Sequence, residues 1–259
     1  MNHWPPRLSR MAKTEKQRLD ILLVEQGLAE SREKAQALIM AGLVFTKDQK
    51  LTKSGHRIDS ATPLTVKGKG HPYVSRGGVK LAGALDHFSE LDASGVVAID
   101  VGASTGGFTD VLLRRGAEKI YAVDVGHGQL DWSLRNDDRV VVLERVNARH
   151  LSEDHIPEPV DMVVCDASFI SLTKVLPASL GLVKSGGMLA ALIKPQFEVG
   201  KGQVGKGGVV RDPELHQAVQ DDIAAWLAND MGWQVLGITE SSITGPEGNR
   251  EFIIAARKP

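Results

Sequence analysis

The stretch that most constrains the fold is a glycine-rich turn, Asp100-Val-Gly-Ala-Ser-Thr-Gly-Gly-Phe-Thr-Asp110. It follows an apolar run, residues 96–99, and precedes an amphipathic run, residues 111–115. An apolar run, a glycine turn and a helical pattern are typical of the first strand and first helix of an open α/β sheet. Glycines leave room where the turn is tight and where a ligand approaches the backbone. The sequence therefore predicts a ligand site at the start of this helix.

The spacing of the glycines bears on the identity of the ligand. A dinucleotide fingerprint has the form G-x-G-x-x-G, whereas here Ser104 takes the second glycine position and the pair Gly106-Gly107 is offset. One acid, Asp100, precedes the turn, and another, Asp124, ends the next apolar run. This arrangement resembles S-adenosylmethionine methyltransferases more than NAD enzymes. An ordinary tight turn between a strand and a helix is the alternative.

Apolar runs alternate with helical patterns through the rest of the chain. The runs cover residues 96–100, 119–124, 139–143, 160–166, 188–194, 233–240 and 251–256, and the main helical segments cover 106–115, 171–184 and 213–230. This alternation predicts an α/β fold, a Rossmann-like and mostly parallel sheet of seven strands with helices on both faces. Ligands of such sheets bind beyond the C-terminal ends of the strands. Five polar residues stand there: Asp100, Asp124, Asn147, Asp166 and Lys194.

Charge divides the chain into two parts. Residues 1–80 hold 15 lysines and arginines against 7 acidic residues, whereas the remaining 179 residues hold 16 against 25. A basic front joined to an acidic body indicates two modules, with an anionic partner for the first; a merely solvated basic face is the alternative. The single cysteine, Cys165, suits a reducing cytoplasm. No apolar run approaches the ~20 residues of a membrane-spanning helix, so no membrane partner is expected.

The front part is predicted to be a small α+β domain. Residues 1–17 carry basic side chains and no apolar core, and are predicted as a disordered basic tail. Two helical patterns follow, one closed by Gly27 and one that begins after Ser31 as N-cap and is closed by Gly42. Glycine and proline near residue 70 predict a boundary, so residues 18–67 form the domain and residues 68–75 a linker.

This front domain resembles the RNA-binding domain named after a small-subunit ribosomal protein, the S-four domain. The resemblance rests on Arg18-Leu-Asp20, Gly27-Leu28, Ser31-Arg32, Ala35, Leu38-Ile39 and Gly42-x-Val44. It implies that the two helices present basic side chains to structured RNA, and the candidates are Arg18, Arg32 and Lys34. Neutralising phosphates in this way provides affinity but little choice of sequence.

Two lysines and a glutamate complete the chemistry of the second part. Lys194 ends the apolar run 189–193 and would be desolvated, and a second lysine nearby would lower its proton affinity, as a base near neutral pH requires. Lys80 begins an otherwise apolar helical face, and Glu251 begins the last strand. A snorkelling lysine and a solubility charge on an edge strand are the alternatives for these two.

In order, Lys80, Asp166, Lys194 and Glu251 reproduce the Lys-Asp-Lys-Glu tetrad of FtsJ-like ribose 2′-O-methyltransferases. With the glycine turn and the segment Lys194-Pro-Gln-Phe-Glu198, residues 18–257 closely resemble the TlyA family, also called hemolysin A. The resemblance implies a methyltransferase domain over residues 76–259, S-adenosylmethionine as cofactor, and ribosomal RNA or ribosomal subunits as partners. It also implies methylation of a cytidine ribose.

The reaction suggests a role for each residue. A sulfonium methyl group is already activated, so the enzyme must align a 2′-hydroxyl and accept its proton. We expect Lys194 to be the base or to stabilise the alkoxide, Asp166 to position it, and Lys80 and Glu251 to orient the hydroxyl. Cofactor binding is predicted for Asp100, Gly102, Ala103, Ser104, Gly106, Gly107, Phe108, Asp124, Asn147, Ala148 and Asp166.

Further RNA contacts are predicted around the catalytic part, at Arg76 and at Lys201 and Lys206 in the glycine-rich segment 200–208. This segment is predicted to be a lid that meets RNA phosphate; a disordered loop is the alternative. No metal is required by the reaction. Two other functions stay open, a membrane-lysing protein and a non-catalytic ribosome-assembly factor. The lack of an apolar span argues against the first, and the complete tetrad argues against the second.

Overall fold

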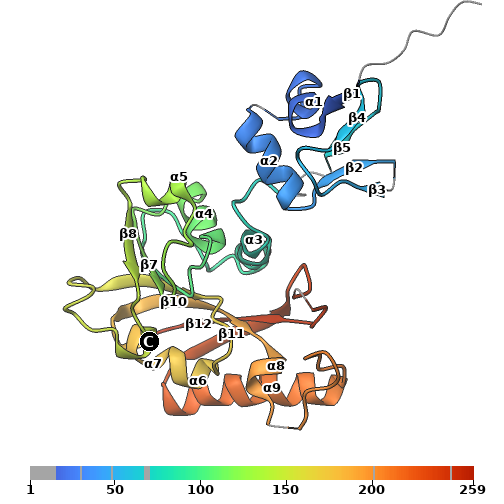
Figure 1. Ribbon diagram of the computed structural model, residues 1–259. Helices are drawn as coiled ribbons and strands as arrows, with labels where there is room; N and C mark the ends of the chain where they lie inside the picture. Colours follow the sequence, from blue (N-terminus) through green and yellow to red (C-terminus); the bar gives the residue numbers. More distant parts are fainter. Residues whose placement is uncertain (1–15, 30, 48, 67–70, 201, 246) are drawn as a thin grey trace, which may run out of the picture. The chain divides into compact units, whose positions relative to one another are not determined.

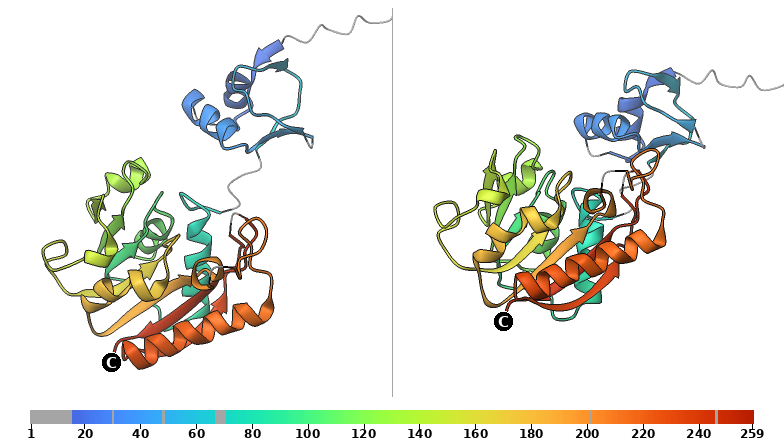
Figure 2. Two further views of the ribbon diagram at one scale, coloured as in Figure 1. Left: turned by 60° about the horizontal axis from the view of Figure 1, so that its bottom comes forward. Right: turned by 90° about the horizontal axis from the view of Figure 1, so that it is seen from below.

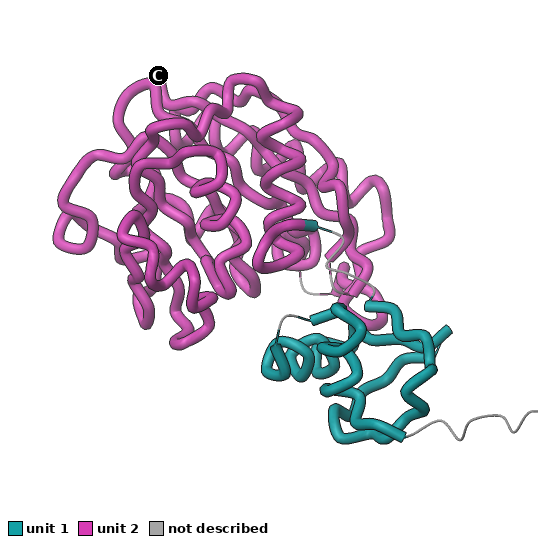
Figure 3. The backbone as a smooth tube through the Cα atoms, turned by 90° about the horizontal axis from the view of Figure 1, so that it is seen from above, with its two compact units in different colours: residues 1–71 teal, residues 72–259 magenta. Residues whose placement is uncertain are grey.

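The computed structural model describes residues 16–29, 31–47, 49–66, 71–200, 202–245 and 247–259 (Figure 1). The chain divides into two units, residues 1–71 and 72–259, which Figure 3 colours separately. Residues 1–15 of the predicted tail, and Lys201, lie outside the described residues.

The described residues of the first unit form two helices, α1 (Leu19–Glu25) and α2 (Arg32–Met40), and two small sheets. Strand β1 (Lys16–Arg18) pairs antiparallel with β4 (Arg57–Asp59), and β2 (Val44–Thr46) pairs antiparallel with β3 (Gln49–Lys50) and β5 (Thr65–Val66). The prediction that residues 16 and 17 belong to a disordered tail is wrong, because both pair with β4. The helices share one apolar core with the strands: Leu19, Leu22, Leu23, Ala35, Ile39, Val44, Leu51 and Leu64.

The predicted helix ends of this unit are confirmed. Ser31 Oγ accepts a hydrogen bond from Lys34 N at 3.2 Å, as an N-cap does. Gly27 and Gly42 follow the two helices with φ near +68° and +67°, a conformation that glycine adopts without a steric penalty.

A buried carboxylate organises the charges of the first unit. Asp20 is fully buried and accepts hydrogen bonds from Arg18 Nε at 3.0 Å, from Arg32 Nε at 3.0 Å and from Gln36 Nε2 at 3.0 Å. The Arg18 guanidinium holds the pKa of this carboxyl well below its usual range. Arg18 and Arg32, both predicted to meet RNA, therefore also hold an internal acid, whereas Lys34 is exposed on α2.

The second unit is built on a sheet of seven strands in the order β11-β12-β10-β9-β6-β7-β8. All neighbouring pairs are parallel except those of β12, which is antiparallel to β10 and to β11. The strands are β6 (Val97–Val101), β7 (Lys119–Asp124), β8 (Val140–Glu144), β9 (Val160–Cys165), β10 (Val183–Ile193), β11 (Gln234–Glu240) and β12 (Phe252–Arg257). The predicted mostly parallel α/β sheet is confirmed.

Helices cover both faces of this sheet (Figures 1 and 2). Alternate strand residues explain the two layers, because successive side chains of a strand point to opposite faces. Ala98 and Ile120 join the core beneath α3 (Gly77–His87) and α4 (Gly107–Arg114), whereas Ile99 and Tyr121 join the core on the opposite face. That second core is covered by α6 (Leu172–Val175), α7 (Pro177–Gly181) and α9 (Pro213–Ala225). Short elements complete the unit: α5 (Trp132–Arg135), the 3₁₀ turn η1 (Ala148–His150), α8 (Pro195–Glu198) and the π turn η2 (Trp226–Asp230).

The prediction of one helix over residues 171–184 is wrong. The segment breaks into α6 and α7 at Leu176, because Pro177 has no backbone N–H to continue the first helix. Val183 already belongs to β10, which begins before the expected residue 188. Pairing with β9 shifts register between Val183 and Met188, where Gly186 has φ near +81°. The first five residues of β10, Val-Lys-Ser-Gly-Gly, do not form an apolar run, so the apolar pattern predicted only the later part of the strand.

Residues 72–75, which the sequence assigned to the linker, are attached to the second unit. Val74 N donates to Asp110 Oδ2 at 2.8 Å, and an Arg114 guanidinium nitrogen donates to the carbonyl of Pro72 at 3.1 Å. Both partners lie on α4, the helix that follows the glycine turn. The segment is therefore fixed beside that turn.

The order of the strands places the ligand site. Strand β6 has β7 and β8 on one side and β9 on the other, so the direction of winding reverses at β6 and β9. Open α/β sheets bind ligands at this switch point, beyond the carboxyl ends of the strands. Gly102 follows β6 and Asp166 follows β9. Among the described residues, no helix is long and apolar enough to cross a bilayer.

Candidate active site

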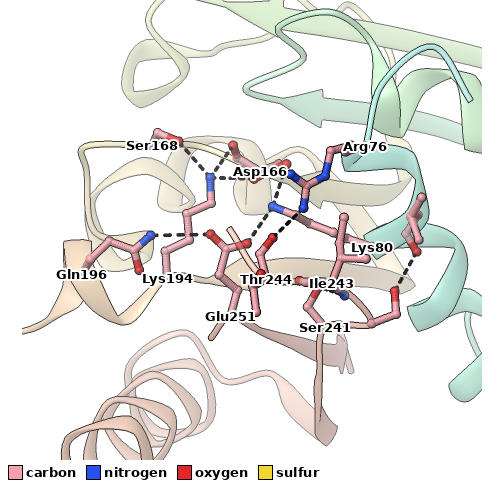
Figure 4. A network of polar contacts seen from close by, with 12 residues as sticks. Arg76, Lys80, Asp166, Ser168, Lys194, Gln196, Ser241, Ile243, Thr244 and Glu251 are labelled. Atoms are coloured by element: carbon pink, nitrogen blue, oxygen red, sulfur yellow. Dashed lines mark hydrogen bonds and ion pairs between the residues drawn. The ribbon is translucent and has the colours of Figure 1, made fainter. Parts of the chain in front are cut away.

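A cleft of about 550 Å³ opens at the switch point. Its walls come from the start of α3, the glycine turn and the ends of β9 and β10, together with Ile243, Thr244, Glu247, Asn249 and Glu251. The four residues of the predicted tetrad all line it, although they lie up to 171 positions apart in the sequence. Figure 4 shows their polar side-chain ends turned toward one another.

The tetrad forms a chain of ion pairs. Lys194 Nζ lies 2.6 Å from Asp166 Oδ1, and Lys80 Nζ lies 3.8 Å from Asp166 Oδ2 (Figure 4). Lys80 Nζ also lies 2.6 Å from Glu251 Oε2. Each oxygen of Asp166 thus faces a different lysine, and the two cations are balanced by two carboxylates. This balance allows the lysines to be buried, each only 7% exposed.

Lys194 has further partners within the cleft. Its Nζ donates to Ser168 Oγ at 2.8 Å and to the carbonyl of Asp166 at 3.1 Å, in addition to its ion pair with the Asp166 carboxylate. Two hydrogen bonds and one ion pair thus meet at this nitrogen. The position of Nζ is therefore set from three directions.

Local structure explains why Lys194 and Glu251 reach the cleft. Lys194 ends the strand run of β10, and Pro195 turns the chain into α8. Glu251 precedes β12, and its carbonyl accepts from Ser241 N at 2.9 Å. Gly245 makes room for the Glu251 carboxylate, since a Cβ at that position would lie 2.6 Å from Glu251 Oε1.

The glycine turn forms the part of the cleft wall beside Asp166. Gly102 has φ near +80°, and a Cβ on it would lie 3.0 Å from the backbone of Ala167. A Cβ on Gly107 would lie 2.3 Å from Ser75 Oγ and 2.8 Å from the backbone nitrogen of Gly78. The turn therefore leaves no room for side chains at these two positions.

Asp124 supports the glycine turn from the end of β7. Its Oδ2 accepts from Ser104 N at 2.8 Å, and its Oδ1 accepts from Gly126 N at 2.7 Å. Six of the predicted cofactor residues line the cleft: Gly102, Ala103, Ser104, Gly107, Phe108 and Asp166. Five lie outside its lining: Asp100, Gly106, Asp124, Asn147 and Ala148.

These five residues make packing or hydrogen-bond contacts outside the cleft lining. Gly106 packs against Leu134, where a Cβ would lie 2.2 Å from Cδ1. Asn147 is exposed and caps η1 by accepting from Arg149 N at 3.1 Å, and Ala148 is part of the core. Asp124 is bonded to the backbone of the glycine turn at Ser104. Asp100 is fully buried.

Asp100 holds the start of α4 rather than facing the cleft. Its Oδ2 accepts from Thr109 N at 2.9 Å and from Thr109 Oγ1 at 2.7 Å, while its buried Oδ1 has no hydrogen-bond partner. Burial raises the pKa of Asp100 to about 7, and the nearby Asp166 carboxylate adds to the rise.

This raised pKa predicts a pH dependence of stability. The folded protein keeps a proton on Asp100 that the unfolded chain releases near pH 4, so stability falls as pH rises from about 4 to about 7. An asparagine side chain cannot titrate. We expect Asp100→Asn to gain about 3 kcal/mol relative to the wild type between pH 5 and pH 8, measured by urea unfolding. The exposed Asp92→Asn is the control, and parallel curves for Asp100→Asn and wild type would contradict the prediction.

Several residues that line the cleft were assigned no role from the sequence, and four of them lie close to the tetrad. Ser168 contacts Lys194, Gln196 Nε2 lies 3.5 Å from Glu251 Oε1, and Asn249 lines the cleft. Phe169 is 89% exposed at the rim, with φ near +65° and its ring 4.9 Å from that of Phe197. The signal that could have identified them is adjacency, since each lies within three positions of a tetrad residue.

The predicted RNA contacts of this unit differ in their surroundings. Arg76 lines the cleft and donates to the carbonyl of Thr244 at 3.2 Å (Figure 4). Lys206 is exposed in the glycine-rich segment, and Lys201 lies outside the described residues. Within the described ranges, no group of three histidine, cysteine, aspartate or glutamate side chains could hold a metal ion.

Comparison with known proteins gives two domain matches. Residues 73–258 match the FtsJ-like methyltransferases, and residues 17–61 match the S4 domain. The chain is 49% identical over 241 residues to a 16S/23S rRNA (cytidine-2′-O)-methyltransferase TlyA of Mycobacterium tuberculosis, covering 93% of this chain and 89% of the relative. It is 40% identical to Hemolysin A of Brachyspira hyodysenteriae, covering 91% and 98%. A solved structure from Streptococcus thermophilus, assigned there as a hemolysin, has a TM-score of 0.73 at 44% identity and covers 95% of this chain and 90% of that one.

Proposed function

The chain belongs to the TlyA family of FtsJ-like methyltransferases, and from this premise we propose that it methylates the ribose 2′-hydroxyl of a cytidine in ribosomal RNA, using S-adenosylmethionine. The observation that carries the proposal is the tetrad itself, two buried lysines and two carboxylates gathered on the wall of a cleft that a glycine turn also lines. A non-catalytic RNA-binding protein would have no use for this buried cluster.

The residues of the cleft fit S-adenosylmethionine. The turn from Gly102 to Gly107 is a cradle that Cβ atoms would fill, and the cleft volume falls within the usual range for small-molecule sites. Ser104 and Gly107 would hold the methionine part through the start of α4. Asp124, at the end of β7, would reach the ribose hydroxyls after a change of its bonds to the turn. When bound, this cofactor supplies an activated methyl group on a positively charged sulfur.

Lys194 would bind the ribose 2′-hydroxyl group through its Nζ. Its ammonium group can donate to the oxygen as negative charge develops there, in a buried site where such an interaction is strong. As a free amine it would instead accept the hydroxyl proton. Asp166 and Ser168 fix Nζ by short contacts, so the hydroxyl would meet a positioned group in either case.

Lys80 and Glu251 would set the geometry of the opposite side. The contact of 2.6 Å between Lys80 Nζ and Glu251 Oε2 would hold the Lys80 ammonium group near Asp166 and balance its charge. The Glu251 carboxylate would orient the ribose hydroxyl toward Lys194. These roles rest on the tetrad geometry.

RNA recognition would begin with the first unit, in the cytoplasm where ribosomes are assembled. Lys34, with Arg18 and Arg32 where their contact to Asp20 leaves them exposed, would bind phosphates. Arg76, Lys206 and Lys201 would add contacts around the cleft. The glycine-rich segment that carries the last two would act as the lid.

Removing residues 1–71 is expected to separate targeting from catalysis. The second unit has apolar cores of its own, distinct from that of the first, so Pro72–Pro259 should fold and bind the cofactor with affinity within about threefold. Loss of the basic patch should lower kcat/KM on ribosomal particles by at least about 10²-fold. Calorimetry and labelled methyl transfer measure the two quantities. Unchanged turnover on particles would contradict a targeting role for the first unit.

The proposed function is tested by incubating the protein with separated ribosomal subunits and cofactor labelled in the methyl group. We expect label in RNA, resistant to alkaline cleavage at one cytidine because the 2′-oxygen is blocked. Label in protein, on a base, or nowhere would contradict the proposal. A haemolysis assay with the same preparations addresses the activity in the relative's name, and lysis that survives Lys194→Ala would point to a separate function.

A further inference from the structure

Asn249 joins two segments of the cleft wall. It is a polar residue only 3% exposed, and both ends of its carboxamide are bonded. Oδ1 accepts from Val210 N at 3.0 Å, and Nδ2 donates to the carbonyl of Gly208 at 2.9 Å. From α9, His216 Nε2 lies 2.9 Å from the carbonyl of Val210. The end of the glycine-rich segment is therefore fastened to the residue two positions before Glu251.

The turn that carries Asn249 is fixed on its other sides as well. Gly245 N donates to the carbonyl of Asn249 at 2.9 Å, and Ser241 N donates to the carbonyl of Glu251 at 2.9 Å. Arg250, between them, points to the surface and pairs with Glu240. Asn249 thus supplies the inward attachment of the chain just before Glu251.

The two joined segments come from opposite sides of the tetrad. Lys194 leads into α8 (Pro195–Glu198), and the chain then runs through the glycine-rich segment to Gly208 and Val210. Glu251 leads into β12 and contacts Lys80 at 2.6 Å. Gly208, Asn249 and Glu251 all line the cleft. The Asn249 carboxamide therefore links the segment that follows Lys194 to the turn that precedes Glu251.

From these contacts we propose that Asn249 is a positioning residue for methyl transfer, which holds Glu251 against Lys80 by fastening its turn to Gly208 and Val210. The inference rests on the proposed function, because Glu251 orients the reaction only if the cleft transfers methyl groups. A carboxamide suits the place because it donates and accepts at once. A carboxylate of the same shape would set an oxygen against the carbonyl of Gly208.

The test is Asn249→Asp in the full-length protein. We expect kcat on ribosomal subunits to fall about 10²-fold at pH 8, because a displacement of catalytic groups of about 1 Å has this effect. The Kd for S-adenosylmethionine should stay within about twofold, since the carboxamide of Asn249 bonds to Gly208 and Val210 and not to the glycine turn. As pH falls, protonation lets the introduced carboxyl group donate to Gly208 again, so the ratio of variant to wild-type kcat should rise.

The control, Asn136→Asp, makes the same chemical change at a residue that does not line the cleft. Asn136 Nδ2 donates to the carbonyl of Trp132 at 2.6 Å on the exposed end of α5, so Asn136→Asp loses the same kind of bond. Its kcat should equal that of the wild type at every pH. The other ionisable side chains around position 249, namely His216, Glu247 and Glu251, are present in both proteins, and the wild-type pH profile records their own contribution.

Three outcomes are distinguishable. A kcat that falls at pH 8 and recovers toward acid pH, with Kd unchanged, supports the positioning role. Wild-type kcat in Asn249→Asp, or an equal loss of kcat and cofactor affinity at all pH values, overturns it. A wild-type protein that transfers no methyl group to RNA contradicts the proposed function instead. Hydrogen exchange at Val210 N then measures the hydrogen bond to residue 249 independently of activity. If the protection of this amide from exchange is the same in Asn249→Asp as in the wild type, the inference is also overturned.

Discussion

Lys194→Ala is expected to lower the rate of methyl transfer by about 10³-fold. The side chain it removes is buried, fixed by Asp166 and Ser168, and the only tetrad lysine within 3 Å of the Asp166 carboxylate. Cofactor affinity should change by less than about threefold, because Lys194 contacts Asp166 and Ser168 rather than the glycine turn. Single-turnover transfer of labelled methyl groups and calorimetry measure the two effects.

A matched control for this variant lies on the same strand. Lys184, at the other end of β10, pairs with Asp161, and its side chain is more than half exposed. Lys184→Ala should keep wild-type turnover, since an exposed ion pair contributes little. If Lys194→Ala loses cofactor affinity in proportion to its rate, Lys194 is a binding residue and the proposed mechanism is wrong.

Gly107→Ala is expected to abolish most cofactor binding, with Kd raised at least about tenfold. The added Cβ would lie 2.8 Å from the backbone nitrogen of Gly78 and 3.2 Å from the carbonyl carbon of Gly77, so α3 or α4 must move. Overpacking of this kind costs about 1–3 kcal/mol of stability. The displaced α4 start is the part that would meet the methionine end of the cofactor. Calorimetry and thermal unfolding measure the two effects.

Gly181→Ala provides the comparison for Gly107→Ala. Gly181 ends α7 with open space around a Cβ, so alanine should leave stability equal or raise it by up to about 1 kcal/mol, because alanine favours helices. Cofactor affinity should be unchanged. A Gly107→Ala protein with wild-type affinity would show that the cofactor does not bind against this turn.

Much of the second unit was predictable because its strands are buried on both faces and form apolar runs in the sequence. The predicted runs 119–124 and 233–240 match β7 (Lys119–Asp124) and β11 (Gln234–Glu240) closely. The break between α6 and α7 was missed, although Pro177 marks it. The apolar positions on both sides of the proline still follow helical spacing, and periodicity alone does not register a lost hydrogen bond.

The site was predictable at the level of which residues meet, and less so at the level of how they face. Lys80, Asp166, Lys194 and Glu251 line one cleft, as the resemblance to the family implied. Asp100 was expected to bind cofactor, yet its carboxylate turns into the core and holds Thr109. The direction of a side chain at a strand end depends on what packs on either side. Asn249 was missed for the same reason, since its partners Gly208 and Val210 are 39 or more positions away.

Strand β12 runs against its two neighbours, and this reversal bears on how the tetrad can exist. Asp166 and Lys194 follow the C-terminal ends of β9 and β10, whereas Glu251 precedes the first residue of the antiparallel strand β12. Had β12 been parallel, its first residue would sit at the far edge of the sheet, about 20 Å away for a six-residue strand. Because β12 is reversed, the residue before its first position, Glu251, lies at the same edge of the sheet as the C-terminal ends of β9 and β10. In this architecture, a search for functional residues at strand ends must therefore include the start of the reversed strand.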